Sequence, residues 1–295
     1  MRISPTSRLI AVLLAGALAQ PVLASNLSDL LNKAIENPDL VNSVVGAVQN
    51  TIDANRTIGP KEEKTLGDGM AANLLGAAPL VGNAGLQSYV NQVGRWVASQ
   101  SEAPNLDWRF GVIDTPNVNS FATPGGVVLI TRGLMDRLRN ESELAGVLGH
   151  EITHVLRHHV TRAAQSGKGR EAVANALQGV AQYKTDDARR QLGANVLSGV
   201  SEVYVRGLDK DDEFEADVTG MVLAARAGYN PYALVSVLQT LGEINPADGS
   251  VKLMFSTHPS PQARLDYIDR NIGSKLEKYA GGVENTARFR AATGR

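Results

Sequence analysis

The spacing of hydrophobic positions divides the chain into helical and extended segments. From Lys61 to about Ser99 apolar residues recur every three or four positions, as in LQSYVNQVGRWVASQ, and this spacing predicts helical structure. Residues 25–60 carry shorter apolar stripes between Asn, Asp and Pro, which predict an N-terminal helical extension. No repeat of about 20 to 50 residues occurs, so solenoids and propellers are excluded.

Two short segments in the middle of the chain have the composition of β-strands. LDWRFGVID (106–114) and GGVVLIT (125–131) are rich in Val, Ile and aromatic residues. The connecting sequence TPNVNSFATP contains turn residues, so we expect a hairpin-like pair of strands. A helix should begin at Glu141, with Asn140 as its N-cap and Glu143 as the capping-box partner.

The rest of the chain is expected to be mostly helical. Residues 161–207 have helical spacing but few large apolar side chains, which favours a pair of small surface helices over a mobile flap. A further helix should run from about Asp211 to Gly228, and the Asn-Pro pair at 230–231 should begin the next one. Residues 273–295 are expected to be a polar tail. The pattern predicts a predominantly helical α+β fold, with a small sheet next to the helix that starts at Glu141.

Composition and charge exclude several classes of function. Lys and Arg number 29 against 30 Asp and Glu, so the chain has no strong positive field for nucleic acid. There is no cysteine, and a bound metal ion must therefore be held by histidines and carboxylates.

The first residues have the pattern of an export signal. Arg2 and Arg8 supply positive charge, an apolar run of about 11 residues follows, and small residues lead to a cleavage site after Ala24. The apolar run is too short for a membrane span of about 20 residues, and no later segment is long and apolar enough. We expect a signal peptide at residues 1–24, a periplasmic location, and no integral membrane segment.

Four of the five histidines lie in the stretch GHEITHVLRHH. On a helix, His150 and His154 differ by about 40° around the axis and about 6 Å along it, so both imidazoles can bind one ion. In this H-E-x-x-H arrangement Glu151 is the candidate general base. His158 lies about 12 Å along the axis from His150, too far to share that ion. His158 and His159 are expected in the last helical turns.

The third metal ligand must come from another part of the chain. In DDEFEADVTGMVLAARAG, Glu213 is the candidate ligand and Asp217, one turn later, the acceptor for the second ring N–H of a ligand histidine. Small residues on the same face let this helix press against the first one. Gly146 and Gly149 each cost the first helix about 1 kcal/mol, which also indicates a close approach. Glu215 and the two acids that open the stretch are expected to be solvated.

The fifth histidine, His258, stands in the loop sequence FSTHPSPQARL. We expect it to reach the site. Two roles are open: it donates a hydrogen bond to a developing oxyanion, or it fills the fourth metal position in a resting state.

Four segments together resemble a known family. NSFATPGGVVLITRGL, HEITHVLRHH, EFEAD and THPSPQAR, in this order, are similar to zinc metallopeptidase family 48, which includes HtpX, the CAAX prenyl endopeptidase and BepA. The resemblance covers about residues 60–272. It implies a zincin-like (gluzincin) catalytic domain at 61–272 that holds one Zn²⁺ per chain.

The resemblance also implies roles for individual residues. It implies zinc ligands at His150, His154 and Glu213, a general base at Glu151, and the acid of an E-x-x-x-D motif at Asp217. His258 matches a His-Pro segment, and Arg264 follows it and is expected to pair with an acid near the site.

The expected function is that of a compact, exported member of this family. We expect neither the membrane spans of HtpX nor the helical repeats of BepA. The resemblance to the compact, exported members implies turnover of unfolded or misassembled envelope proteins. Protein or peptide substrates would add as a strand beside GGVVLIT, whose edge is expected to be open. Envelope assembly factors are expected partners. The alternatives are a chaperone-like protein or a regulated protease held shut by His258, and an aminopeptidase.

Overall fold

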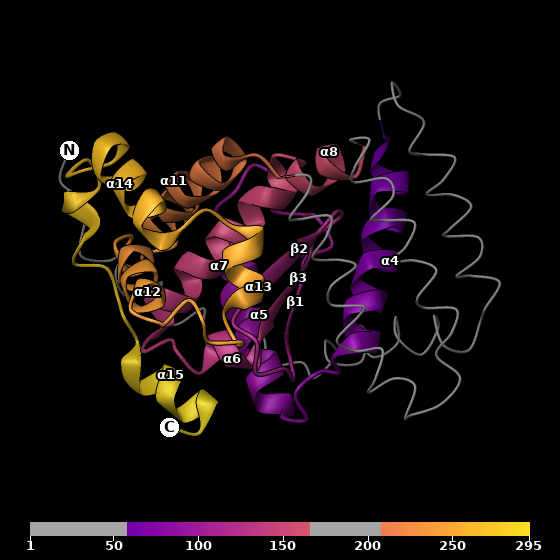
Figure 1. Ribbon diagram of the computed structural model, residues 1–295, viewed down its shortest axis with the longest axis horizontal. Coiled ribbons are helices and arrows are strands. Elements are labelled where there is room, and N and C mark those ends of the chain that lie inside the picture. Colours follow the sequence, from indigo (N-terminus) through magenta and orange to yellow (C-terminus); the bar gives the residue numbers. More distant parts are fainter. Residues whose placement is uncertain (1–57, 166–207) are drawn as a thin grey trace, which may run out of the picture.

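Helices surround one small sheet in the computed structural model, which describes residues 58–165 and 208–295 (Figure 1). The elements are α4 (Pro60–Ala77), α5 (Ala84–Ala98), β1 (Arg109–Ile113), β2 (Ser120–Thr123), β3 (Val127–Thr131), α6 (Arg132–Met135), α7 (Glu141–Leu156), α8 (His159–Gln165), α11 (Lys210–Arg226), α12 (Ala233–Gly242), α13 (Lys252–Thr257), α14 (Pro261–Asn271), η2 (Glu277–Tyr279) and α15 (Thr286–Thr293). The predominantly helical α+β fold is confirmed. None of the described helices is both long and apolar enough to cross a bilayer.

Several expected segments lie wholly or largely outside the described residues. These are the signal peptide at 1–24, nearly all of the extension at 25–60, and most of the segment 161–207, of which only the part in α8 is described. Within the described part, the helical stretch from Lys61 to Ser99 is confirmed as two helices, α4 and α5, separated near Pro79.

The sheet has three strands in the order β1–β3–β2, and the predicted hairpin-like pair is wrong. β1 and β3 run parallel, while β2 lies within the expected connection and pairs antiparallel with β3. Because β2 has only four residues between turn signals, its pattern was too short to predict a strand. Gly125 and Gly126, with φ of +80° and +101°, make the β2–β3 turn.

The position of β3 also corrects the expected open edge. GGVVLIT forms the central strand, hydrogen-bonded on both sides, so no peptide can add to it. β2 is the strand at the edge of the sheet nearer to α7 and α4. A substrate strand beside β3 is therefore excluded.

Both faces of the sheet are buried against helices. Alternate strand residues such as Val128 and Ile130 pack in the cluster that includes α5 and α7, while Leu129 packs in the cluster formed with α4. Figure 1 shows α4 and α7 on opposite sides of the strands. Burial on two faces explains why residues 127–130 of β3 form a continuous apolar run.

The start of α7 confirms one half of the predicted capping box. The Asn140 side chain accepts a hydrogen bond from the Glu143 N–H at 2.9 Å, as expected for an N-cap. The reciprocal bond is absent among the contacts of these residues: the Glu143 carboxylate accepts instead from the backbone N–H of Arg139 at 2.6 Å and from its guanidinium. The guanidinium of Arg139 adds an ion pair to this carboxylate, which favours its position beside Arg139 over one beside the Asn140 N–H.

The first residue of α7, Glu141, is buried and anchors the C-terminal segment. Its carboxylate accepts the Asn285 amide at 2.8 Å and the Arg288 guanidinium. Phe289, in α15, packs into the core. The hydroxyls of Tyr89 and Tyr229, both buried, also donate hydrogen bonds to the Glu141 carboxylate. Thus the segment 273–295, expected as a polar tail, contributes a helix that fixes the start of α7.

Helices α7 and α11 touch through their backbones. A Cβ atom on Gly149 would lie 2.8 Å from the Gly220 carbonyl oxygen, and one on Gly220 would lie 2.6 Å from the His150 nitrogen. Gly146 lies against Leu234 of α12, where a Cβ would come within 3.1 Å of the Leu234 Cβ. The close approach predicted from the glycines is confirmed, and it brings the two candidate ligand-bearing helices together.

The α7–α11 contact predicts a sharp response to one methyl group. Gly220→Ala should lower the free energy of unfolding by about 1–3 kcal/mol, because the added Cβ must push α11 away from the His150 backbone. Urea unfolding followed by circular dichroism measures the change. Gly242→Ala is the matched control, since its Cβ would meet only the Pro261 Cβ at 3.6 Å. Equal stability of the two variants would contradict the contact.

Candidate metal centre and active site

One face of α7 presents three of the predicted site residues to the interior. His150, Glu151 and His154 are all buried. The Nε2 atoms of His150 and His154 lie 3.0 Å apart. Two imidazole lone pairs that face each other at this distance suit a shared cation, because only one of the two nitrogens can carry a proton there.

Helix α11 brings Glu213 to the same point. Its Oε2 lies 3.7 Å from His150 Nε2 and its Oε1 lies 3.4 Å from His154 Nε2. Glu213 Oε1 is buried and has no hydrogen-bond partner. Tetrahedral zinc with bonds of about 2.0–2.2 Å places neighbouring ligand atoms roughly 3.3 Å apart. The spacing of these atoms and the unpaired carboxylate oxygen therefore fit a zinc ion.

Asp217 and Arg264 lie behind His150. Asp217 Oδ1 is 2.9 Å from His150 Nδ1, and the Arg264 guanidinium donates to both oxygens of Asp217. Burial by itself would raise the pKa of Asp217, but the adjacent Arg264 outweighs it and lowers that pKa. An ionised Asp217 keeps the His150 proton on Nδ1, so Nε2 offers its lone pair to the site. The structure brings both residues to the positions expected from the sequence.

His154 has a different support, which the sequence reasoning missed. Its Nδ1 lies 3.0 Å from Nδ1 of His159, a fully buried residue. His159 Nε2 faces Glu215 Oε2 at 3.3 Å and Asp212 Oδ1 at 3.4 Å. A chain of hydrogen bonds thus runs from His154 through the His159 imidazole to the Glu215 carboxylate of α11, and the Asp212 carboxylate lies beside it.

The expectation that His158 and His159 sit in the last turns of the helix is wrong. α7 ends at Leu156, and His158 has a φ of +54°, so the chain bends before α8 begins at His159. On a continuous helix a residue five positions after His154 would point about 140° away from it. The bend at His158 directs the His159 side chain towards His154. Helical spacing alone could not predict this bend.

Among the acids at the start of α11, Glu215 is exposed as expected, whereas Asp212 differs from the expectation. Glu215 has 46% of its side chain exposed and pairs with Arg157, yet its other oxygen reaches His159. Asp212, expected to be solvated, is only 16% exposed because it faces His159 and Arg162. Buried imidazole N–H groups need an acceptor, which explains why these carboxylates turn inward.

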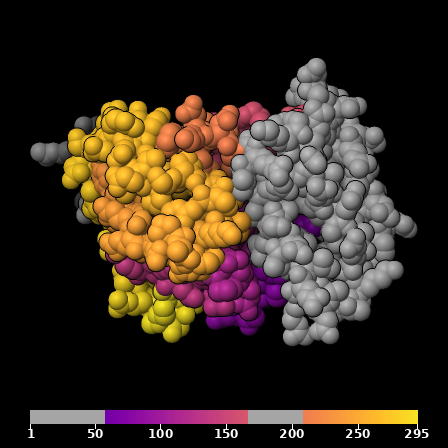
Figure 2. All heavy atoms as spheres, viewed as in Figure 1, coloured from indigo at the N-terminus to yellow at the C-terminus, as the bar shows by residue number. Residues whose placement is uncertain are grey.

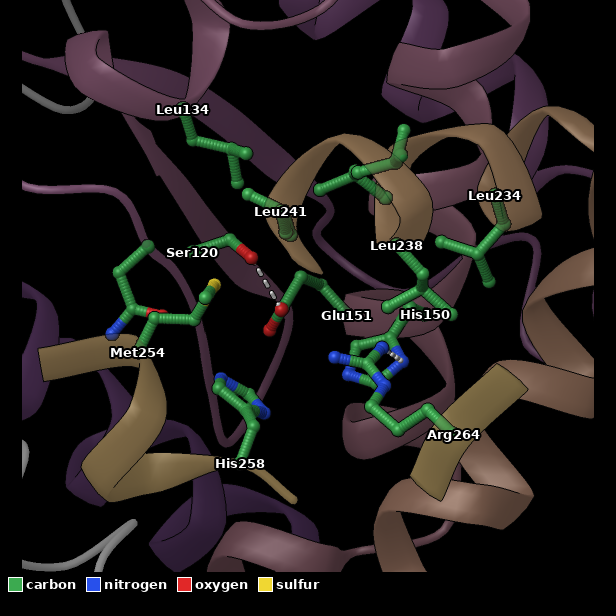
Figure 3. Close-up of a pocket in the computed structure, with 13 residues that line it drawn as sticks. Ser120, Leu134, His150, Glu151, Leu234, Leu238, Leu241, Met254, His258 and Arg264 are labelled. Atoms are coloured by element: carbon green, nitrogen blue, oxygen red, sulfur yellow. Dashed lines mark hydrogen bonds between the residues drawn. The ribbon is translucent and has the colours of Figure 1, made fainter. Parts of the chain in front are cut away.

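Glu151 faces a pocket that His150 and His258 also line (Figure 3). Its Oε1 accepts a hydrogen bond of 2.7 Å from the Ser120 hydroxyl, while its Oε2 is buried and unpaired. Burial raises the pKa of Glu151, an effect that His150 and Ser120 partly oppose. A carboxylate with one fixed and one vacant oxygen suits a general base. Ser120 escaped the sequence reasoning because β2 was not predicted.

His258 reaches the site, as expected from the sequence. It caps the end of α13, and its Nδ1 lies 2.5 Å from Glu213 Oε2. One ligand atom from each of His150, Glu213 and His258 lies within 4.8 Å of the others, so these three also form a group able to hold a metal ion. Glu213 is common to both triplets: Oε1 faces His154 and Oε2 faces His258.

Comparison with known proteins identifies the family. Residues 85–272, more than half of the chain, match the model of peptidase family M48. The chain belongs to peptidase family M48. This membership confirms the resemblance and the expected class, a zinc metallopeptidase of zincin-like fold. In this M48 family member the candidate base Glu151 lies beside two histidines and a glutamate whose atoms could hold a metal ion, as in the H-E-x-x-H arrangement.

Several curated relatives carry protease names. The beta-barrel assembly-enhancing protease of Escherichia coli (strain K12) is 29% identical over 215 residues, which are 72% of this chain and 44% of the relative. Its counterpart from Yersinia pestis is 30% identical over 229 residues, 77% of this chain and 47% of the relative. Metalloprotease YcaL of Escherichia coli (strain K12) is 30% identical over 165 residues, 56% and 62% of the two chains. The M48 peptidase described here spans less than two thirds of each.

The support of His154 by His159 predicts a loss of metal affinity. His159→Phe keeps a buried aromatic ring but removes both nitrogens, so the zinc dissociation constant should rise about 10- to 100-fold. Competition with a chromophoric chelator measures it. The neighbouring His158, whose side chain is 59% exposed, supplies the control: His158→Asn should bind zinc as the wild type does. Unchanged affinity in the His159 variant would rule out the positioning role.

Proposed function

We propose that this M48 peptidase is a zinc-dependent endopeptidase that cleaves unfolded or misassembled envelope proteins. One zinc ion per chain would be held by His150, His154 and Glu213. The observation that carries the proposal is the placement of Glu151: a desolvated carboxylate with a vacant oxygen, next to converging histidine nitrogens. Protease names among the relatives support it.

The side chains divide the work of hydrolysis. When bound, zinc supplies Lewis acidity that polarises the scissile carbonyl and lowers the pKa of water. Glu151 accepts the proton of the attacking water and passes it to the leaving nitrogen. Ser120 holds one carboxylate oxygen so that the other faces the reacting atoms. Asp217 keeps the His150 proton away from the metal-facing nitrogen.

The location and the mode of substrate binding are part of the proposal. The signal-like residues 1–24 support export to the periplasm, and the names of the relatives support envelope assembly factors as partners. The peptide would lie extended along the line of β2, since Ser120, the first residue of that strand, contacts Glu151. This orientation replaces the excluded addition to β3.

Removal of the base tests the proposed reaction. Glu151→Gln should lower the rate of casein cleavage by about 10²- to 10⁴-fold, because the amide cannot accept the proton of water. Zinc content, measured by atomic absorption, should stay at one per chain. A chelator should stop cleavage by the wild type, and added zinc should restore it. Cleavage by the Gln variant at the wild-type rate would overturn the mechanism.

A second candidate function is a regulated protease, or a chaperone-like protein, whose site His258 holds shut. The observation that favours it is the 2.5 Å contact between His258 Nδ1 and Glu213 Oε2. His258→Ala separates the possibilities in a casein assay. A higher rate than wild type identifies a closing ligand, and a lower rate identifies a donor to the oxyanion. No cleavage by either protein, with zinc bound, identifies the chaperone-like function.

A further inference from the structure

The bend between α7 and α8 contains a strained backbone. His158 has a φ of +54°, and among the described residues Asn285 is the other non-glycine residue with a positive φ. This left-handed conformation brings the Cβ atom of an L residue close to the following carbonyl oxygen, so it persists only where surrounding contacts impose it. The next residue, His159, contacts His154 through their Nδ1 atoms at 3.0 Å. The contacts that impose the bend therefore also place His159.

One carboxylate of α4 holds the chain on both sides of His159. Glu63 Oε1 accepts a hydrogen bond of 2.6 Å from His158 Nδ1 and another of 2.6 Å from the Thr161 hydroxyl. An ionised carboxylate only accepts, so His158 carries a proton on Nδ1 in this contact. Glu63 is 13% exposed and Thr161 is buried, so the bond between them is largely shielded from water. Figure 1 shows α8 beside one end of α4. The Glu63 side chain thus bridges residues that flank His159.

Glu63 is itself held in place by the packing of α4 on the sheet. One turn later in α4, a Cβ atom on Gly67 would lie 1.5 Å from the Pro124 carbonyl oxygen, so the helix touches the β2–β3 turn through its backbone. The next residue, Asp68, forms an ion pair of 2.6 Å with Arg109 of β1. These two contacts prevent α4 from sliding along the sheet. The bend is therefore held against a carboxylate whose own position is set by the sheet.

The contact with His158 adds little to the overall stability of the fold. The His158 side chain is 59% exposed, and an ion pair with an exposed group contributes little net free energy. Figure 2 shows atoms in the colour of the α7–α8 part of the chain at the upper edge of the described part of this face, in accord with a position at the surface. The consequence of the contact is instead geometric, because the bend directs the fully buried His159 ring towards His154.

We propose that Glu63 is a positioning residue of the metal centre: it holds the bend at His158, and the bend keeps the His159 ring against His154. Without this carboxylate the strained backbone relaxes and His159 turns away, so His154 loses the partner that fixes its ring. The inference rests on the proposed zinc-dependent function. It extends the metal centre beyond residues 85–272, which match the family model, to α4, which precedes them.

Removal of the carboxylate tests the proposal. Glu63→Ala should raise the zinc dissociation constant about 10-fold, the lower end of the effect expected for a group that orients a ligand. In the metal-free protein, exchange of the Arg162 amide, which bonds to the His158 carbonyl at 2.9 Å, should become about 10-fold faster because the bend loosens. Competition with a chromophoric chelator and hydrogen exchange followed by NMR measure the two effects. A zinc dissociation constant equal to that of the wild type would overturn the proposal.

A second variant of α4 separates positioning from attachment of the helix. Asp68→Asn removes the charge that pairs with Arg109 and leaves the bend untouched. It should loosen α4 but bind zinc with wild-type affinity. Equal losses of zinc affinity in the Glu63 and Asp68 variants would show that Glu63 only attaches α4, which contradicts the proposal.

Two double variants test the path from Glu63 to His154. In the His159→Phe background, Glu63→Ala should cause no further loss of zinc affinity, because the ring through which Glu63 acts is already altered. Glycine adopts a positive φ without strain, so Glu63→Ala combined with His158→Gly should return the zinc dissociation constant to within about 3-fold of the wild-type value. Additive losses in the first double variant, or no recovery in the second, contradict the proposal.

The variant His158→Asn is compatible with this role of Glu63. Asparagine adopts a positive φ more readily than most residues, and its amide can still donate to the Glu63 carboxylate. Because zinc binding is measured without substrate, the proposal and the peptidase function can fail separately. Wild-type protein that binds zinc without cleaving casein would overturn the peptidase function alone, whereas an unaffected Glu63→Ala variant would overturn this proposal alone. Wild-type protein that binds no zinc would overturn both.

Discussion

The whole site depends on one backbone contact, where Gly149 of α7 meets Gly220 of α11. Two helices with ordinary side chains at the crossing point pack with axes about 8–10 Å apart. At that separation a glutamate side chain from α11 would have farther to reach towards two histidines of α7. The absence of two Cβ atoms closes the gap, and the ligand atoms then come within 3.4–3.7 Å of one another. Gly149 and Gly220 are therefore needed to bring the candidate ligands together, although glycine lowers the stability of each helix.

The close contact creates a problem of buried charge that the surrounding residues solve. Three carboxylates of the site, those of Glu151, Glu213 and Asp217, are all buried. Arg264 compensates Asp217 directly, and the histidines compensate Glu213, whose pKa they hold well below its usual range against the effect of burial. Glu151 has the weakest compensation, and its pKa is raised. The candidate base Glu151 thus differs from the candidate ligand Glu213 in the charges of its neighbours.

The two candidate ligand histidines, His150 and His154, are supported in different ways. His150 is backed by a buried carboxylate fixed by an arginine, which leaves no freedom of orientation. His154 is backed by His159, which leads to carboxylates partly open to solvent. Both arrangements direct a lone pair to the same point, but only the second connects the site to the surface of α11. The bend at His158 is therefore as much a part of the site as the H-E-x-x-H motif.

The sequence by itself determined the local chemistry of this protein. Helical periodicity places His150, Glu151 and His154 within one helix turn or so of each other, and the E-x-x-x-D spacing does the same for Glu213 and Asp217, because the geometry of a single helix relates such residues. The helical content and the start of α7 follow from the same short-range rules.

Tertiary structure alone decided which distant segments meet. Contacts across the sheet decide that β1 pairs in parallel with β3 and that β2 lies at the edge. The edge position of β2 in turn places Ser120 beside Glu151. A strand of four residues is too short for its hydrophobic pattern to predict these contacts. His159 turns towards His154 only because the chain bends at His158. Asn119 and residues of α12, far apart in the sequence, line the same pocket. Short-range interactions leave a pattern in the spacing of residues along the sequence. Packing between distant segments leaves no such pattern and is seen only in the folded structure.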